Sequence, residues 1–151
     1  MELLLSIKPK YSEKIFSGKK RYEFRKQKPR RVVDRIFIYE SHPSKNIVGW
    51  FSVKKIHSGC PEDIWMKCKS LSGLEEKNYF NYCKGSKIIY AFEIDKTFEF
   101  DNPINPLEIV SDFKPPQSFK YIDDSTLYKK LENKFDHIFK GELKQETIEV
   151  Y

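Results

Sequence analysis

The stretch from Lys87 to Phe100 begins with Ile, Tyr, Ala and Phe side chains in near-continuous succession. β-Branched and aromatic residues favour extended backbone, and a run without a polar face is typical of a strand buried on both sides. Alternation of polar and apolar residues resumes at Lys96, where the strand should become half exposed. This segment therefore predicts a long strand that crosses the middle of a sheet.

Four more segments have the character of strands. Leu3–Ile7 is short and apolar and is closed by a lysine-proline pair, while Val32–Glu40 and Ile47–Ile56 are rich in β-branched and aromatic residues. Within the last of these, Gly49 predicts a bulge or a close approach of another chain segment. From residue 19 to 25 basic and aromatic residues alternate, which predicts a strand with one strongly charged face.

Helical spacing separates these strands. Pro9–Ser17 has proline in its first turn and is followed by Gly18, which favours a helix of about two turns with a glycine cap. Pro61–Lys69 and Leu74–Cys83 predict two helices inserted between strands. Ser125–Phe139 carries Leu, Phe and Ile at helical period, as expected of a helix packed on the core.

A proline-rich segment precedes that last helix. Pro103, Pro106, Pro115 and Pro116 predict a long loop without regular structure, which contains enough Ile, Leu and Phe to pack against the sheet. Residues 141–151 either add a short strand or fray. With 151 residues in all, we expect one α+β domain with a core over residues 2–100, on which the segment 101–151 packs.

The positive charge is concentrated in one region. Between Lys8 and Arg35 there are twelve Lys and Arg against three acids, a local charge of +9, whereas the whole chain carries +6. An evenly mixed surface would indicate only solubility, but a local excess of this size favours a polyanionic partner such as nucleic acid.

Other chemistries have weaker support. The three cysteines, Cys60, Cys68 and Cys83, have neither disulfide-scaffold nor zinc-ligand spacing, and the three histidines are isolated, so we expect no metal and no cofactor. No apolar run is long enough for a membrane span or a signal-peptide core, which predicts a cytoplasmic protein.

A motif lies within the basic region. Leu5 to Pro9 reads LSIKP and residues 15–25 read IFSGKKRYEFR, so that Gly18 and Lys20 form a Gly-x-Lys pair and Arg25 follows five residues later. This arrangement resembles the signature of ASCH domains, in which a strand and a short helix lead to these residues. The resemblance extends loosely to about residue 100, and residues 115–121 (PPQSFKY) are similar to a segment of longer ASCH proteins described as predicted transcriptional regulators.

The resemblance implies a small mixed β-barrel with a cleft lined by the signature, similar to PUA and EVE domains that hold RNA or modified bases. Arg25 would offer a planar fork to a phosphate or base edge, and Lys20 a mobile charge. Glu23 either accepts from a base amino group or orients Lys20 through an ion pair. Lys20 and Arg25 fall on opposite faces of an ideal strand, so a bulge or the strand ends must bring them together. Further candidates for the same cleft are Lys8, Tyr39, Ser41, Gln117, Ser118 and Phe119.

Our leading functional hypothesis is a monomeric module that binds single-stranded RNA, other single-stranded nucleic acid or a modified nucleoside in a basic cleft, with a possible regulatory role. The alternative is a metal-independent hydrolase. ASCH proteins of similar layout act on acylated pyrimidine nucleosides or RNA, using the signature lysine with a threonine three residues later; that position is Glu23 here, so Lys20 and Glu23 would be the catalytic pair. A third reading is an adaptor that docks through its C-terminal helix.

Overall fold

A computed structural model describes residues 2–123 and 125–133 of the chain. In chain order its elements are β1 (Glu2–Ile7), α1 (Pro9–Phe16), β2 (Tyr22–Arg25), β3 (Arg35–Glu40), β4 (Asn46–Gly59), α2 (Pro61–Cys68), η1 (Lys69–Leu71), α3 (Glu76–Cys83), β5 (Ile89–Ile104), η2 (Pro106–Glu108) and β6 (Phe119–Tyr121). Residues 126–133 are also helical.

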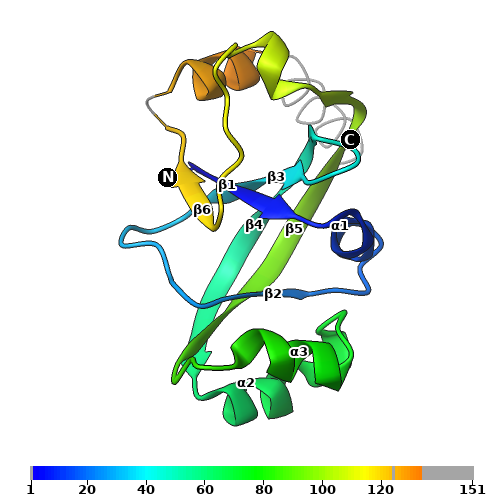
Figure 1. The fold of residues 1–151 in the computed structure, drawn as a ribbon, viewed down its shortest axis with the longest axis vertical. Coiled ribbons are helices and arrows are strands. Elements are labelled where there is room, and N and C mark those ends of the chain that lie inside the picture. The colour runs from blue at the N-terminus through cyan, green and yellow to red at the C-terminus, as the bar shows by residue number, and fades with distance from the viewer. Residues whose placement is uncertain (1, 124, 134–151) are drawn as a thin grey trace, which may run out of the picture.

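Within the described residues the strands form one sheet in the order β2-β5-β4-β3-β1-β6. The β1 and β3 strands are parallel, and every other neighbouring pair is antiparallel. The sheet is mixed and curls into a half-barrel, with α2 and α3 gathered at one end of the long β4–β5 pair (Figure 1). The architecture is therefore the expected α+β fold, and β5 lies inside the sheet as its sequence predicts.

Strand β1 is covered on both faces. Leu3 and Leu5 point into one core cluster, whereas Leu4, between them, points into a second cluster on the opposite face. The same alternation divides Ile38 and Tyr39 of the neighbouring β3. Successive side chains on a strand point to opposite faces, so a continuous apolar run is what a doubly covered strand requires.

A third cluster forms where the α2–α3 insert packs on the sheet. Phe24 of β2 contacts Tyr79 of α3, with ring centroids 5.1 Å apart, and Trp65 of α2 stacks on the same tyrosine at 4.7 Å. Tyr79 is fully buried and its hydroxyl donates to the carbonyl of Pro61 at 2.8 Å. This cluster attaches the insert to β2, the strand that carries Glu23 and Arg25.

Several expectations about element boundaries need correction. β3 begins at Arg35 rather than at Val32, which is 85% exposed. β5 continues to Ile104 and so includes Pro103, because the β4–β5 ladder is irregular there and a proline is tolerated where pairing is interrupted. The proline-rich segment is not devoid of regular structure, since β6 pairs with the outer edge of β1. Finally, β2 begins only at Tyr22, which leaves Lys20 in the turn that precedes it.

The helical stripe near the C-terminus is confirmed as far as it is described. Leu127 and Leu131 are buried in the second core cluster, one helical turn apart. Phe135, Ile138 and Phe139, together with residues 141–151, lie outside the described residues.

The close approach expected at Gly49 is present. An added Cβ would overlap the carbonyl oxygen of Phe98 on β5 and come within 2.7 Å of the Phe16 ring. The ladder between β4 and β5 also shifts register at this point. Glycine is therefore required for α1 to pack closely against the sheet.

We expect Gly49→Ala to lower the free energy of unfolding by about 2 kcal/mol or more, because backbone and a packed ring must both move. Chemical denaturation measures the change. The matched control is Gly59→Ala on the same strand, where a Cβ would meet its nearest atom, in the Ile64 side chain, at an ordinary 3.6 Å. Equal losses in the two variants would contradict the proposed close contact.

Candidate functional site

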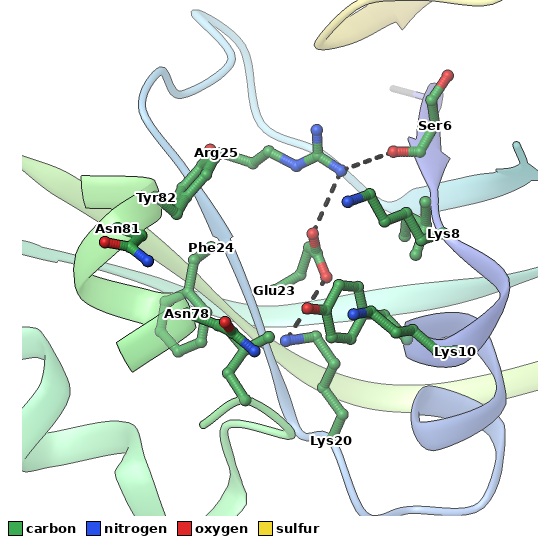
Figure 2. A pocket seen from close by; sticks show the side chains of 13 residues that line it. Ser6, Lys8, Lys10, Lys20, Glu23, Phe24, Arg25, Asn78, Asn81 and Tyr82 are labelled. Atoms are coloured by element: carbon green, nitrogen blue, oxygen red, sulfur yellow. Dashed lines mark hydrogen bonds and ion pairs between the residues drawn. The ribbon is translucent and has the colours of Figure 1, made fainter. Parts of the chain in front are cut away.

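A pocket of about 370 Å³ opens beside the signature, within the size range of small-molecule sites (Figure 2). Its walls come from the end of β1, the start of α1, the segment from Lys20 to Arg25 and one face of α3. The lining residues are Ser6, Ile7, Lys8, Lys10, Tyr11, Lys20, Glu23, Phe24, Arg25, Leu74, Asn78, Asn81 and Tyr82.

The floor and the rim of the pocket differ in exposure. Lys20, Glu23 and Phe24 are buried at the floor, with 2%, 8% and 4% of their surfaces exposed. Lys8 and Lys10 at the rim are exposed, as are Asn78, Asn81 and Tyr82. A ligand that enters therefore meets exposed cations first and the buried Lys20, Glu23 and Phe24 last.

A tight turn carries Lys20 into the interior. α1 ends before Gly18, whose φ of 81° reverses the chain, and the Lys20 amide then donates to the Lys14 carbonyl at 2.9 Å. The lysine side chain passes against Gly73, where an added Cβ would lie 2.7 Å from the Lys20 Cβ. Gly73 also has a φ of 70°, so both space and backbone conformation favour glycine there.

The Lys20 ammonium contacts four groups. It donates to the Ser72 carbonyl at 2.7 Å and lies 3.8 Å from Glu23 Oε2. It also lies 5.6 Å from the Tyr11 ring centroid and 5.0 Å from that of Phe24, within cation–π range. Burial lowers the pKa of Lys20, the nearby cations Arg25 and Lys14 lower it further, and Glu23 opposes these effects.

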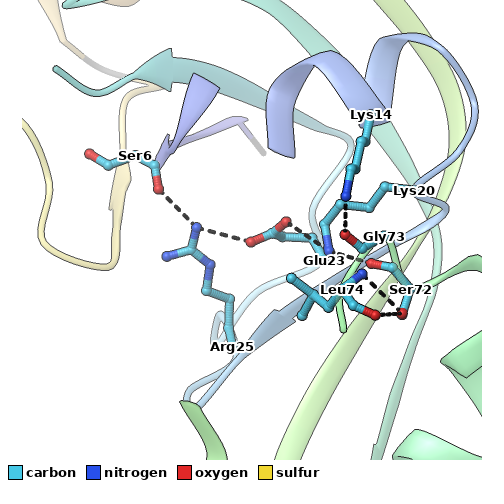
Figure 3. Close-up of polar contacts among 8 residues, drawn as sticks. All are labelled: Ser6, Lys14, Lys20, Glu23, Arg25, Ser72, Gly73 and Leu74. Carbon is cyan, nitrogen blue, oxygen red and sulfur yellow. Dashed lines mark hydrogen bonds and ion pairs between the residues drawn. The ribbon is translucent and has the colours of Figure 1, made fainter. Parts of the chain in front are cut away.

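Glu23 bridges two cations (Figure 3). Its Oε1 lies 3.2 Å from the Arg25 guanidinium, which also donates to the Ser6 carbonyl at 3.0 Å. Its Oε2 is buried, faces Lys20 and accepts no hydrogen bond from any residue that the structure describes. The Nε of Arg25 is likewise buried without an acceptor in the described chain. Two residues of the pocket lining, Glu23 and Arg25, thus each keep a buried polar atom whose hydrogen-bonding capacity no described residue uses.

The signature residues meet without a bulge in β2. Glu23 and Arg25 are two residues apart on β2 and share a face, whereas Lys20 precedes the strand and is not bound by its alternation. Of the two roles considered for Glu23, the ion pair with Lys20 is present.

Tyr39 and Ser41 are not among the pocket residues. Tyr39 is buried in the second core cluster, where its ring lies 5.4 Å from that of Phe113. Tyr39 pairs with Ser6 on β1. Its side chain points to the face of the sheet opposite to that of Ile38. Ser41 follows β3, and its amide donates to the Ile7 carbonyl at 3.0 Å, so its backbone supports the end of β1.

Gln117, Ser118 and Phe119 lie near the pocket without lining it. The Ser6 hydroxyl donates to the carbonyl of Pro116 at 2.7 Å, and this bond holds the segment beside Ser6. The Ser6 carbonyl in turn accepts a hydrogen bond from the Arg25 guanidinium. Phe119 pairs with Leu5 and packs against the first core cluster, so it fills space in the core.

The pocket also contains residues that we did not anticipate. Among them are Lys10 and Tyr11 on α1 and Asn78, Asn81 and Tyr82 on α3. The three α3 residues have the spacing of one helical face, which the sequence displays. The sequence of α3 alone does not indicate which element of the fold this helical face packs against.

Two negative findings bear on the site. Across residues 2–123 and 125–133, no group of three or more His, Cys, Asp or Glu side chains is placed to hold a metal ion. No helix in the described part of the chain is long and apolar enough to span a membrane.

Comparison with known proteins identifies the family. The family model of the ASCH domain matches residues 5–103. The chain belongs to the ASCH domain family. An ASCH domain-containing ribonuclease from Zymomonas mobilis is 30% identical over 128 residues, which cover 80% of this chain and 84% of that protein. The resemblance based on Gly18, Lys20 and Arg25 is thereby confirmed.

Structural comparison gives the same family. The crystal structure of ASCH from Zymomonas mobilis matches with a TM-score of 0.78 and 29% identity, covering 87% of this ASCH chain and 94% of that one. A ribosomal protein, uL22 of Ureaplasma parvum, is 28% identical over 121 residues, which cover 80% of this chain but only 39% of the ribosomal protein.

We expect Glu23→Gln to lower the pKa of Lys20 further, because the carboxylate stabilises the ammonium form and a neutral amide does so less. A pH titration of the lysine side-chain carbons by NMR measures this pKa. Glu13→Gln, which removes an exposed carboxylate from α1, is the control and should leave the Lys20 midpoint unchanged. A midpoint that stays constant or rises in Glu23→Gln would show that the ion pair does not tune the lysine.

Proposed function

We propose that the pocket binds one nucleotide of a single-stranded RNA, or a modified nucleoside of similar size. The observation that carries the proposal is the combination of rim cations, a buried carboxylate with an unused acceptor oxygen and two tyrosine rings in one cavity. The similarity to a protein named as a ribonuclease supports RNA as the ligand class.

Each part of a nucleotide finds a complementary group. Lys8 and Lys10 extend from the rim, where a phosphate remains partly hydrated. Glu23 and Arg25 line the cavity, and a small shift of either side chain lets the carboxylate accept from a base N–H or the guanidinium donate to a base or sugar oxygen. Tyr11 and Tyr82 offer ring surface against which an unpaired base can stack.

The first test removes the rim cations. Lys8→Ala/Lys10→Ala should weaken binding of a fluorescently labelled single-stranded RNA by about tenfold at low salt and make the salt dependence shallower, since each lost phosphate contact removes about 0.7 from the slope of log K against log salt. Fluorescence anisotropy at several salt concentrations measures both quantities.

The matched control is Lys54→Ala/Lys55→Ala, which removes the same charge from exposed positions on β4. It should stay within about twofold of the wild type. If both double variants lose affinity equally, the protein attracts RNA only through its net charge and the pocket is not the site.

Hydrolysis is the second candidate, and the state of Lys20 favours it. A lowered pKa enlarges the neutral fraction of the amine, which can then accept a proton from a hydroxyl or water that attacks an RNA phosphate or an acyl group. The proton moves to Lys20, the attacking oxygen forms the new bond and the leaving oxygen or nitrogen takes the electron pair of the bond that breaks. Glu23 then stabilises the ammonium that has formed.

Incubation with short RNAs and with acylated cytidine tests this step. If wild-type protein forms product, Lys20→Met should abolish turnover, whereas Lys19→Met, which removes the exposed neighbouring lysine, should retain it. Circular dichroism verifies that both variants fold. Absence of product from the wild type, or full activity in Lys20→Met, would rule out this mechanism.

A further inference from the structure

The loop after β2 carries part of the basic segment that the pocket does not use. Residues 26–34 connect β2, at one edge of the sheet, to β3 in its interior. Lys26, Lys28, Arg30 and Arg31 all lie on this loop and are exposed. In Figure 1 the loop swings out from β2 and returns beside β6, the other edge strand.

The loop backbone is fastened at several points. Pro29 is buried, and Val33 is 8% exposed within the first core cluster. The backbone amide of Arg30 donates to the hydroxyl of Tyr121 on β6 at 2.9 Å. The exposed cations therefore project from a backbone whose position is held by the core and by the edge strand.

Three of these cations lie over tyrosine rings contributed by three different elements. Lys26 lies 4.9 Å from the ring centroid of Tyr82 on α3, Lys28 lies 5.9 Å from that of Tyr90 on β5, and Arg31 lies 6.0 Å from that of Tyr121 on β6. We call these six residues the tyrosine track. Tyr82 and Tyr121 are 38% and 39% exposed, so part of each ring is accessible to a ligand.

The tyrosine track begins at the pocket. Tyr82 lines the cavity, and Arg25, also in the lining, directly precedes Lys26 (Figure 2). From Lys26 to Arg31 the extended chain reaches at most about 18 Å. An RNA that leaves the pocket at Tyr82 therefore meets Lys26 first, with Lys28 and Arg31 further along the same loop, which passes Tyr121 of β6.

The chemistry of the track fits unpaired nucleic acid. Surfaces that hold single strands combine cations for the phosphates with aromatic rings for the bases. A base can take the place of a Lys or Arg over the ring, because the displaced cation then pairs with the adjacent phosphate. In a duplex the bases are already stacked on each other and cannot reach the rings.

We propose that the tyrosine track binds the continuation of a single-stranded RNA whose first bound nucleotide occupies the pocket. The inference rests on the proposed function of the pocket. It adds an extended interface that runs from the pocket along the loop toward β6. The protein would then recognise one nucleotide in the cavity and hold the neighbouring nucleotides without reading their sequence.

The test compares two ligand lengths, a labelled RNA of about three nucleotides and one of about twelve. Lys28→Ala/Arg31→Ala should weaken binding of the longer RNA by about tenfold, with a salt slope shallower by about 1.4, and leave the shorter RNA within about twofold. Lys54→Ala/Lys55→Ala serves as the charge-matched control. Tyr121→Ala should weaken binding of the longer RNA. Tyr121→Phe keeps the ring but loses the hydrogen bond from the Arg30 amide, and because Pro29 and Val33 still hold the loop it should largely preserve that binding.

The outcomes separate the two proposals. If the wild type binds both RNAs with similar affinity, or if Lys28→Ala/Arg31→Ala behaves like the control, the tyrosine track is not an RNA surface while the pocket proposal stands. If neither RNA binds, both proposals are wrong. Double-stranded RNA serves as a competitor. If Lys28→Ala/Arg31→Ala loses affinity for the double strand and for the single strand equally, the track is a purely electrostatic patch and the stacking role is overturned.

Discussion

Burial of the Lys20 ammonium is the interaction on which the pocket depends. Removing such a charge from water costs several kcal/mol, so its partners must be held closely in place. The carbonyl of Ser72 and the carboxylate of Glu23 meet this need from two different parts of the chain. The signature turn and the α2–α3 insert are thus attached to each other through one side chain.

Two further hydrogen bonds, one from a backbone amide and one from a lysine side chain, reinforce that attachment. The amide of Arg21 donates to the Leu71 carbonyl at 2.8 Å, and Lys14 donates to the Gly73 carbonyl at 3.0 Å. Because α3 follows directly, these bonds also position Asn78, Asn81 and Tyr82 opposite β2. The composition of the pocket wall is therefore a consequence of how the insert docks on the turn.

The strands and helices were accessible from sequence because their signals are local. Hydrophobic period, proline and glycine located β1, α1, β4 and β5 to within a few residues, and the Gly18, Lys20 and Arg25 motif indicated the family. The burial of Lys20 was not accessible, since it requires Gly73 to lie against the lysine, a contact between residues 53 positions apart. The same limit hid the α3 face and led us to expect Tyr39 in the pocket, although strand alternation directs it to the other side of the sheet.

The β1–β6 pairing joins the two ends of the described chain, with Leu3 opposite Tyr121. The Glu2 carbonyl accepts from the Ile122 amide at 3.2 Å, so this seam continues past β6. During synthesis, the N-terminal strand emerges long before its outer neighbour exists, and one of its edges stays unpaired until residue 121 has left the ribosome. Completion of the sheet is therefore a late event in the synthesis of this domain, and a chain truncated before this point retains an open strand edge available to other chains.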